Sequence, residues 1–200
     1  TAPHGLTHSL LLPWFDDFLQ AHPGVRLHLT VGDRLQDLLR DELDLALRFG
    51  ALPDSALIAR PLCTTTRIVC AAPAYLTQHA APTHPRELAQ HNCLTFDVNG
   101  RRLNRWVLSR DGEAFTANVD GDRHSNDSSL ALYWALRGHG VVFTAEVGLR
   151  HELAAGTLVR VLPDWQGEAY PLNAVLPSRR FVPQRVRALV DYLAERFAGN

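Results

Sequence analysis

The sequence predicts an α/β protein with two Rossmann-like lobes that are joined by two crossover strands. Strand and helix patterns alternate in residues 1–49 and again in residues 119–162, and shorter strands with several prolines lie between these blocks. Alternation of this kind implies mostly parallel sheets with right-handed connections. Each block has about 40 residues and is too small to bury much surface by itself.

The first block starts with a helix whose apolar residues recur at helical spacing. Pro13 stands early in that pattern, so regular helix is expected from about His8. The next segment alternates apolar and polar residues, which is typical of a half-buried strand. In chain order we expect a helix over residues 8–21, a strand over 25–31, a helix over 33–43 and a strand over 44–49.

A region of short elements separates the two blocks. Residues 57–70 have an extended pattern that is interrupted by Thr64, Thr65 and Thr66. Short helices are expected at 74–79 and 86–90, and short strands at 93–96, 106–108 and 114–117. The second block and the C-terminal part then have strands at 119–122, 141–143, 159–162 and 172–176, helices at 126–137 and 146–154, and a last helix that begins at Pro183.

The chain is expected to cross between the lobes near residues 64–67 and again near residues 167–172. This places residues 1–66 and 172–200 in lobe I and residues 67–171 in lobe II. Two crossings form a hinge and leave a cleft between the lobes. Ligands of open α/β folds bind in such a cleft, at the carboxyl ends of the strands.

Composition narrows the class of protein. The chain has 200 residues, 46% of them hydrophobic, and a formal net charge of −1, which is the balance of a soluble globular protein. A nearly neutral chain has little electrostatic attraction for nucleic acid or anionic membranes. No apolar run approaches the ~18–20 residues that a membrane span needs. The sequence contains no methionine, so we expect a processed chain or a fragment of a longer one.

Motifs along the whole chain resemble, in order, the effector-binding region of LysR-type transcriptional regulators. The main motif is DLALRFG at residues 44–50, followed by LPDSALIAR at residues 52–60. The set is specific when taken together, although no single piece is. Supporting stretches are residues 2–3, 70–76, 91–94, 126–127, 138–141, 156–162 and 177–180.

The resemblance implies a fold like that of type 2 periplasmic binding proteins, with a small-molecule effector, such as a carboxylate or an aromatic, bound between the lobes. It also implies a cytoplasmic homodimer, which forms a higher homo-oligomer in the full-length protein. DNA is contacted only through an N-terminal winged helix-turn-helix domain, which is absent from this chain. No cofactor and no membrane partner are expected. The dimer would pair the first helix and second strand of lobe I with their counterparts in lobe II. Its expected residues are Trp14, Phe18, His28, Tyr133 and Trp134.

Effector contacts are expected in three loops and at one strand end. Helix N-termini present free N–H groups and a partial positive charge, which suit a carboxylate or another electron-rich effector. Many relatives have Ser where this chain has Gly5, so that hydroxyl contact is missing here and Thr7 or His4 would replace it. The expected effector-binding residues are His4, Gly5, Thr7, Thr64, Thr65, Thr66, Ser125, Asn126, Phe143 and Thr144.

Some of these residues also have purely structural explanations. The three threonines are ordinary residues for an extended hinge, Asn126 suits a helix N-cap, and Phe143 suits a core. His4 and His8 are four residues apart, but two histidines without a third ligand make a poor metal site.

Cys63, Cys70 and Cys93 are odd in number and form no CxxC pair, so buried, inert thiols are expected rather than disulfides or a zinc site. A redox switch is the alternative, although no nearby group favours a low thiol pKa.

Three classes of function remain open. A regulatory domain of a transcription factor is the expected one, and a solute-binding protein for transport shares the same architecture. An enzyme on this fold is the third, although no GxSxG, HExxH or GxxxxGK[ST] motif occurs. His124, Ser125 and Asp127 are too close in sequence to define a catalytic triad, which is recognised by geometry. We therefore expect a sensor that is not an enzyme.

Overall fold

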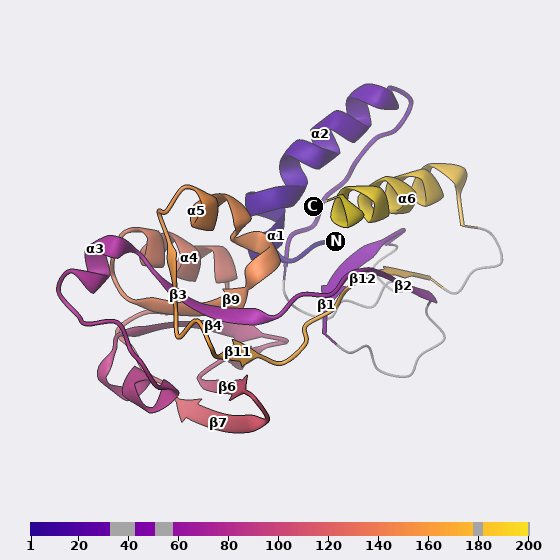
Figure 1. Cartoon of the computed structure of the whole chain (residues 1–200). Coiled ribbons are helices and arrows are strands. Elements are labelled where there is room, and N and C mark those ends of the chain that lie inside the picture. The colour runs from indigo at the N-terminus through magenta and orange to yellow at the C-terminus, as the bar shows by residue number, and fades with distance from the viewer. Residues whose placement is uncertain (33–42, 51–57, 178–181, 200) are drawn as a thin grey trace. The chain divides into compact units, whose positions relative to one another are not determined.

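A computed structural model describes residues 1–32, 43–50, 58–177 and 182–199 (Figure 1). Internal contacts divide the chain into unit 1, with Thr1–Thr65 and Tyr170–Asn200, and unit 2, with Thr66–Ala169. The chain thus passes into unit 2 after Thr65 and returns after Ala169. The lobe boundaries expected from the sequence were 66/67 and 171/172.

Unit 1 contains an antiparallel sheet in the order β1–β12–β2. Helix α6 (Gln184–Ala198) lies on this sheet, and α2 (Leu12–Ala21) packs against α6 (Figure 1). The ring centroids of Trp14 and Phe197 are 4.9 Å apart, and those of Phe18 and Tyr192 are 5.4 Å apart. Aromatic side chains therefore join the two helices. The strands are β1 (Ala46–Phe49), β2 (Ile58–Cys63) and β12 (Leu172–Leu176).

The first helical segment begins earlier than expected. It consists of α1 (His4–Leu6), a π-helical turn (Thr7–Leu11) and α2, so helix starts at His4 and not near His8. The wider π turn precedes Pro13, whose ring would clash with a carbonyl of the preceding turn in a regular α-helix. The turn therefore lets the chain be helical on both sides of the proline.

The strand expected over residues 25–31 is mostly absent. The segment has no ladder, and its β contact is an isolated bridge between Val31 and Ala2. The helix expected over 33–43 falls almost entirely on residues outside the described ranges, and the strand expected over 44–49 is the shorter β1.

Unit 2 is built on a sheet in the order β10–β3–β9–β4–β5, with β8 also pairing with β4. Alternating residues of β3 divide its side chains between two cores. Val69 and Ala71 pack with Trp106 and Phe143 on one face, while Ile68 and Cys70 pack under α4 on the other. The strands are β3 (Arg67–Ala71), β4 (Cys93–Val98), β5 (Arg101–Arg102), β8 (His124–Ser125), β9 (Val141–Ala145) and β10 (Val159–Val161).

A second, three-stranded sheet and several short helices complete unit 2. The sheet has the order β11–β6–β7, with β6 (Arg105–Arg110), β7 (Glu113–Asn118) and β11 (Gln166–Gly167). The helices are α3 (Pro73–Leu76), α4 (Ser128–Leu136), α5 (Arg150–Ala154) and the 3-10 helices η2 (Pro85–Gln90) and η3 (Glu146–Gly148). Residues 119–122, expected as a strand, are irregular, and the strand lies at His124–Ser125 instead.

The expectation of mostly parallel sheets is wrong. Among the described strands, β4 runs parallel to β9 and β8, and the other ladders are antiparallel. The reason is that strands distant in sequence enter between neighbours. β12 returns from the C-terminal part between β1 and β2, and β3 lies between β9 and β10.

Candidate functional site

A chain of polar contacts lies at the carboxyl end of β4. The hydroxyl oxygen of Thr95 is 3.1 Å from Nδ1 of His124, and Nε2 of His124 is 3.1 Å from a carboxylate oxygen of Asp97. Nε of Arg102 donates to the Thr95 hydroxyl oxygen at 3.0 Å, and Nη2 of Arg102 donates to Asp120 at 2.7 Å. We call Thr95, Asp97, Arg102 and His124 the β4 network.

Strand register brings these residues together. Thr95 and Asp97 are two residues apart in β4, so their side chains point to the same face. The parallel strand β8 places His124 opposite Thr95, and the antiparallel strand β5 places Arg102 opposite Asp97. The network is therefore built by β4 and by the two short strands that pair with it, β5 and β8.

The geometry suits ligand binding better than nucleophilic catalysis. Thr95 is 1% exposed and its oxygen already accepts a hydrogen bond from Arg102, so it is not placed as an attacking hydroxyl. The side chains of Asp97, His124 and Arg102 are 26%, 37% and 37% exposed. A buried hydroxyl thus orients a cation and an imidazole that solvent can reach.

The loop after β8 leads into helix α4. The Asp127 carboxylate accepts from the backbone N–H of Ser129 at 2.8 Å and from its hydroxyl at 2.6 Å, and the Ser125 hydroxyl accepts from the N–H of Asp127 at 3.0 Å. Asp127 is therefore the N-cap, and the N-cap explanation for Asn126 is wrong. Asn126 is exposed beside the cap.

The expected residues of unit 1 have different settings. His4 and Gly5 open helix α1 and are half-buried. Thr7 is 1% exposed and its hydroxyl donates to the carbonyl of Pro3 at 2.7 Å. Its side chain is thus engaged inside the helix and does not replace the serine hydroxyl of relatives.

The threonines near the passage between the units differ from one another. Thr64 is exposed. The carbonyl of Thr65 accepts from Tyr170 at 2.7 Å, and the carbonyl of Thr66 accepts from Glu146 at 2.9 Å. Backbone bonds of Thr65 and Thr66 therefore anchor the two sides of the passage within their own units.

Phe143 lies in the core of unit 2, which agrees with the structural role that its sequence position also suggested. It is 3% exposed and stacks on Trp106 with ring centroids 5.2 Å apart. Phe143 is therefore a core residue of unit 2. Thr144, the next residue of β9, is half-buried.

Two of the five expected dimer residues are not at the surface. Trp14 is 6% exposed and Phe18 is 2% exposed, because both pack between α2 and α6. Their helical spacing reflects the core of unit 1. Tyr133 is 53% exposed, His28 is exposed, and Trp134 is half-buried against the core beneath α4.

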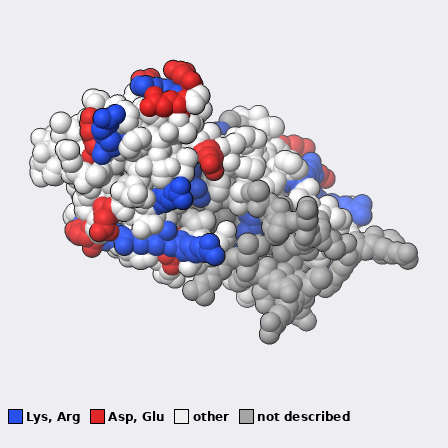
Figure 2. All heavy atoms as spheres, turned by 90° about the horizontal axis from the view of Figure 1, so that it is seen from below, with Lys and Arg blue, Asp and Glu red and all other residues white. Residues whose placement is uncertain are grey.

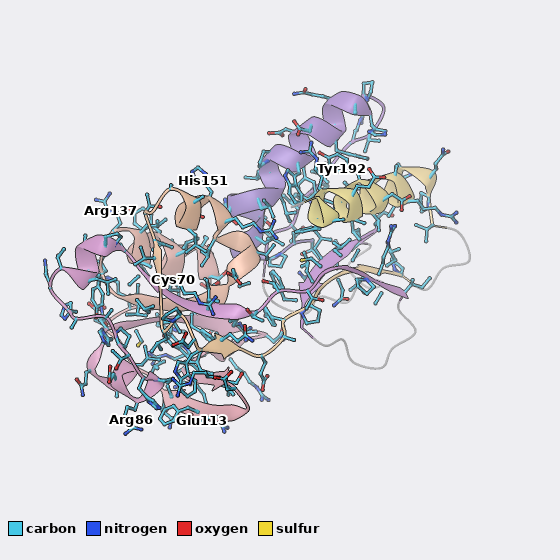
Figure 3. The ribbon with its side chains drawn as sticks, viewed as in Figure 1. Cys70, Arg86, Glu113, Arg137, His151 and Tyr192 are labelled. Atoms are coloured by element: carbon cyan, nitrogen blue, oxygen red, sulfur yellow. The ribbon has the colours of Figure 1, made fainter. Side chains whose placement is uncertain are left out.

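The thiols of unit 2 have an apolar setting. Cys70 lies within the interior of unit 2 in Figure 3, and both Cys70 and Cys93 are 0% exposed. Burial raises the pKa of each thiol to about 12, which keeps both protonated and unreactive near neutral pH. Cys63 is half-buried in unit 1.

The described residues hold no group of three or more His, Cys, Asp or Glu side chains placed to bind a metal ion. Within the same ranges, no helix has the length and apolar character to span a membrane. On the described part of the face in Figure 2, basic and acidic side chains lie close to one another.

Comparison with known proteins gives the family. The model of the LysR substrate binding domain matches residues 1–198. The regulatory domain of CrgA, a LysR-type transcriptional regulator from Neisseria meningitidis, aligns with a TM-score of 0.87 at 30% identity, over 98% of this chain and 96% of that domain. This chain therefore belongs to the LysR family as an effector-binding domain.

Relatives place that domain in longer regulators. The HTH-type transcriptional regulator YhjC of Escherichia coli K12 is 36% identical over 194 residues, which are 96% of this chain and 64% of YhjC. Full-length AphB, a virulence activator of Vibrio cholerae, aligns with a TM-score of 0.84 at 29% identity, over 98% of this chain and 66% of AphB. The chain thus spans less than two thirds of each of these two full-length regulators.

The sequence alone did not point to the β4 network. Thr95, Asp97, Arg102 and His124 were not among the expected site residues, although alternating polar residues in the strand over 93–98 were visible. The partner strands β5 and β8 have only two residues each, too few for a periodic pattern.

Proposed function

We propose that this chain senses a small anionic effector for a cytoplasmic transcription regulator and is not an enzyme. The β4 network is the observation that carries the proposal. It joins a partly exposed guanidinium and imidazole to the loop before α4, at the carboxyl end of a sheet strand. The exposed parts of the Arg102 guanidinium and the His124 imidazole, which also contact Asp120 and Asp97, offer hydrogen-bond donors to a ligand with a carboxylate or similar acceptor.

The remaining expected contacts stay part of this proposal. Those in unit 2 are Thr66, Ser125, Asn126 and Thr144, and those in unit 1 are His4, Gly5, Thr64 and Thr65. Effector binding would select one arrangement of the two units. The effector can shift the equilibrium between arrangements only if it binds one of them more tightly than the other. DNA is contacted by a separate helix-turn-helix domain of the full-length protein.

A thermal-shift screen tests effector binding. Small carboxylates, hydroxy acids and aromatic acids are added to the chain at concentrations up to the millimolar range. A ligand at 100 times its Kd stabilises the folded state by about 2.7 kcal/mol, which raises Tm by about 5–10 °C for a chain of this size. A screen in which no acid raises Tm above neutral analogues of the same size contradicts an anionic effector.

We further propose that the outer face of α4 contacts a second copy of the chain. Helix α4 is apolar around its circumference, with Ala131 and Ala135 buried below while Leu130 and Tyr133 remain 43% and 53% exposed. A helix that is apolar on all sides is normally buried, so its outer face requires a partner.

Replacing Tyr133 with a charged residue tests this interface. Tyr133→Glu puts a carboxylate into a desolvated contact, so sedimentation should show the dimer constant weakened by about tenfold or more. Arg86→Gln, on the exposed part of η2, changes the charge by the same amount and should leave association unchanged. An undiminished dimer for Tyr133→Glu would remove α4 from the interface.

A further inference from the structure

The β4 network and its neighbours in the chain carry more carboxylates than guanidinium groups. Arg102, the guanidinium of the network, is already paired with Asp120 at 2.7 Å, and Arg123 is paired with Asp122 at 2.9 Å. The carboxylates are those of Asp97, Asp120, Asp122 and Asp127, and the guanidinium groups are those of Arg101, Arg102 and Arg123. With a neutral His124, an acidic effector would therefore meet a site of net negative charge, which repels it.

The hydrogen bonds of His124 assign the proton of its neutral ring. Nε2 is 3.1 Å from a carboxylate oxygen of Asp97, and an ionised carboxylate only accepts, so Nε2 carries the hydrogen. Nδ1 is 3.1 Å from the hydroxyl of Thr95, whose oxygen already accepts from Nε of Arg102 at 3.0 Å. The Thr95 hydroxyl therefore donates its own proton to Nδ1.

The same contacts can also hold a charged imidazole. A hydroxyl has one donor and two acceptor sites, so the Thr95 oxygen can accept from a protonated Nδ1 of His124 next to the bond from Arg102. Nε2 keeps its contact with Asp97, which then becomes a charge-assisted pair. Because neither ring nitrogen needs a new partner, the network can take up a proton at His124 without a rearrangement of its strands.

Other titratable groups around His124 are less suited to take up a proton near neutral pH. A backbone N–H, and secondly the Arg102 guanidinium, lower the pKa of Asp120, which keeps this carboxylate charged. The Asp127 carboxylate accepts two hydrogen bonds at the start of α4, which also favours its charged form. Helix α4, which packs on β8, has no charged side chain of its own. The Cys93 thiol of β4 is buried and already protonated, with its pKa raised to about 12.

We propose, on the basis of the proposed effector site, that the β4 network binds an acidic effector together with one proton, which the His124 imidazole takes up from the solvent. The negative charge of the effector favours the charged imidazole, and the charged imidazole offsets the excess of carboxylates, so each binding event strengthens the other. Imidazole is the side chain that changes its charge between about pH 5 and 8. The effector is therefore bound more tightly as the pH falls through this range.

Titration calorimetry in two buffers measures the proton directly. At about pH 7 the chain is titrated with the carboxylic acid that gives the largest thermal shift, once in MOPS and once in Tris, which release protons with different heats. The proton for His124 comes from the buffer, so the two binding heats should differ by the uptake of at most about one proton per effector. Kd should fall about tenfold from about pH 8 to about pH 6, a range in which carboxylic acids stay ionised.

His124→Gln distinguishes this histidine from the other titratable groups. A glutamine amide has a donor for Asp97 and an acceptor for Thr95, but it does not titrate. The difference between the buffers should therefore vanish in this variant, and Kd should no longer change with pH. His151→Gln is the matched control, because it removes an exposed histidine of α5 (Figure 3), and it should keep both effects.

The possible results separate proton uptake from effector binding itself. An acid that binds with equal heats in both buffers and with a Kd independent of pH would overturn the proton uptake and leave the effector site in place. A difference between the buffers that persists in His124→Gln would put the proton on another group and overturn the proposal as well. If the chain binds no acid, the effector function itself is contradicted, and the proton uptake with it. The comparison of buffers on the unaltered chain gives its result even where the variant does not fold.

Discussion

Trp106→Ala should lower the free energy of unfolding by about 3–5 kcal/mol, the usual cost of removing a large aromatic side chain from a core. Trp106 is 1% exposed on β6 and stacks on Phe143 of β9. Its indole N–H donates to the carbonyl of Leu103 at 3.1 Å. The substitution therefore leaves a cavity between the two sheets of unit 2 and an unpaired carbonyl.

Urea unfolding followed by circular dichroism measures this effect. Trp106→Phe is the matched control, because it keeps the stacking partner and loses only the indole N–H and part of the volume, so it should cost less than half as much. A loss below about 1 kcal/mol for Trp106→Ala would mean that the two sheets do not share this core.

Trp14→Ala should also cost about 3–5 kcal/mol, because Trp14 joins α2 to α6. The expected result is a lower urea midpoint, with the dimer constant unchanged under conditions where the chain remains folded. This differs from the interface role that the family resemblance implies for the first helix. Sedimentation and urea unfolding of the same sample separate the two effects.

Trp14→Phe provides the control for the second substitution. It retains an aromatic contact with Phe197 at reduced volume, so most of the stability should return. A variant Trp14→Ala with full stability and a weakened dimer would place this side chain at the surface of the monomer, against its 6% exposure here.

Much of the secondary structure could be predicted from local patterns. The apolar runs at residues 67–71 and 141–145 are strands β3 and β9, and the helical spacing after Pro183 is α6. Sheet order could not be predicted, because the antiparallel pairing of β12 with β1 and β2 joins residues at least 109 positions apart and leaves no local pattern. Residues 25–31 have a strand pattern, but within the described ranges their β pairing is an isolated bridge between Val31 and Ala2.

The candidate site could also be predicted only in part. The loop at Ser125–Asp127 could be found because a cap and a helix follow a strand. The β4 network could not, since Thr95 and His124 are 29 residues apart and meet only through a two-residue parallel pairing. Phe143 and Thr7 were predicted from their positions in the sequence. Phe143 is buried in the core, and the buried hydroxyl of Thr7 donates to the carbonyl of Pro3.

Titration calorimetry on Arg102→Gln tests the central claim most directly, with the acid that gives the largest thermal shift as ligand. The β4 network predicts that Kd rises about 10- to 100-fold, because a charge-assisted contact worth about 1.5–3 kcal/mol is lost. Arg86→Gln, with the same change of charge at an exposed position of η2, should leave Kd unchanged. An unaltered Kd for Arg102→Gln would show that the effector does not bind at the carboxyl end of β4.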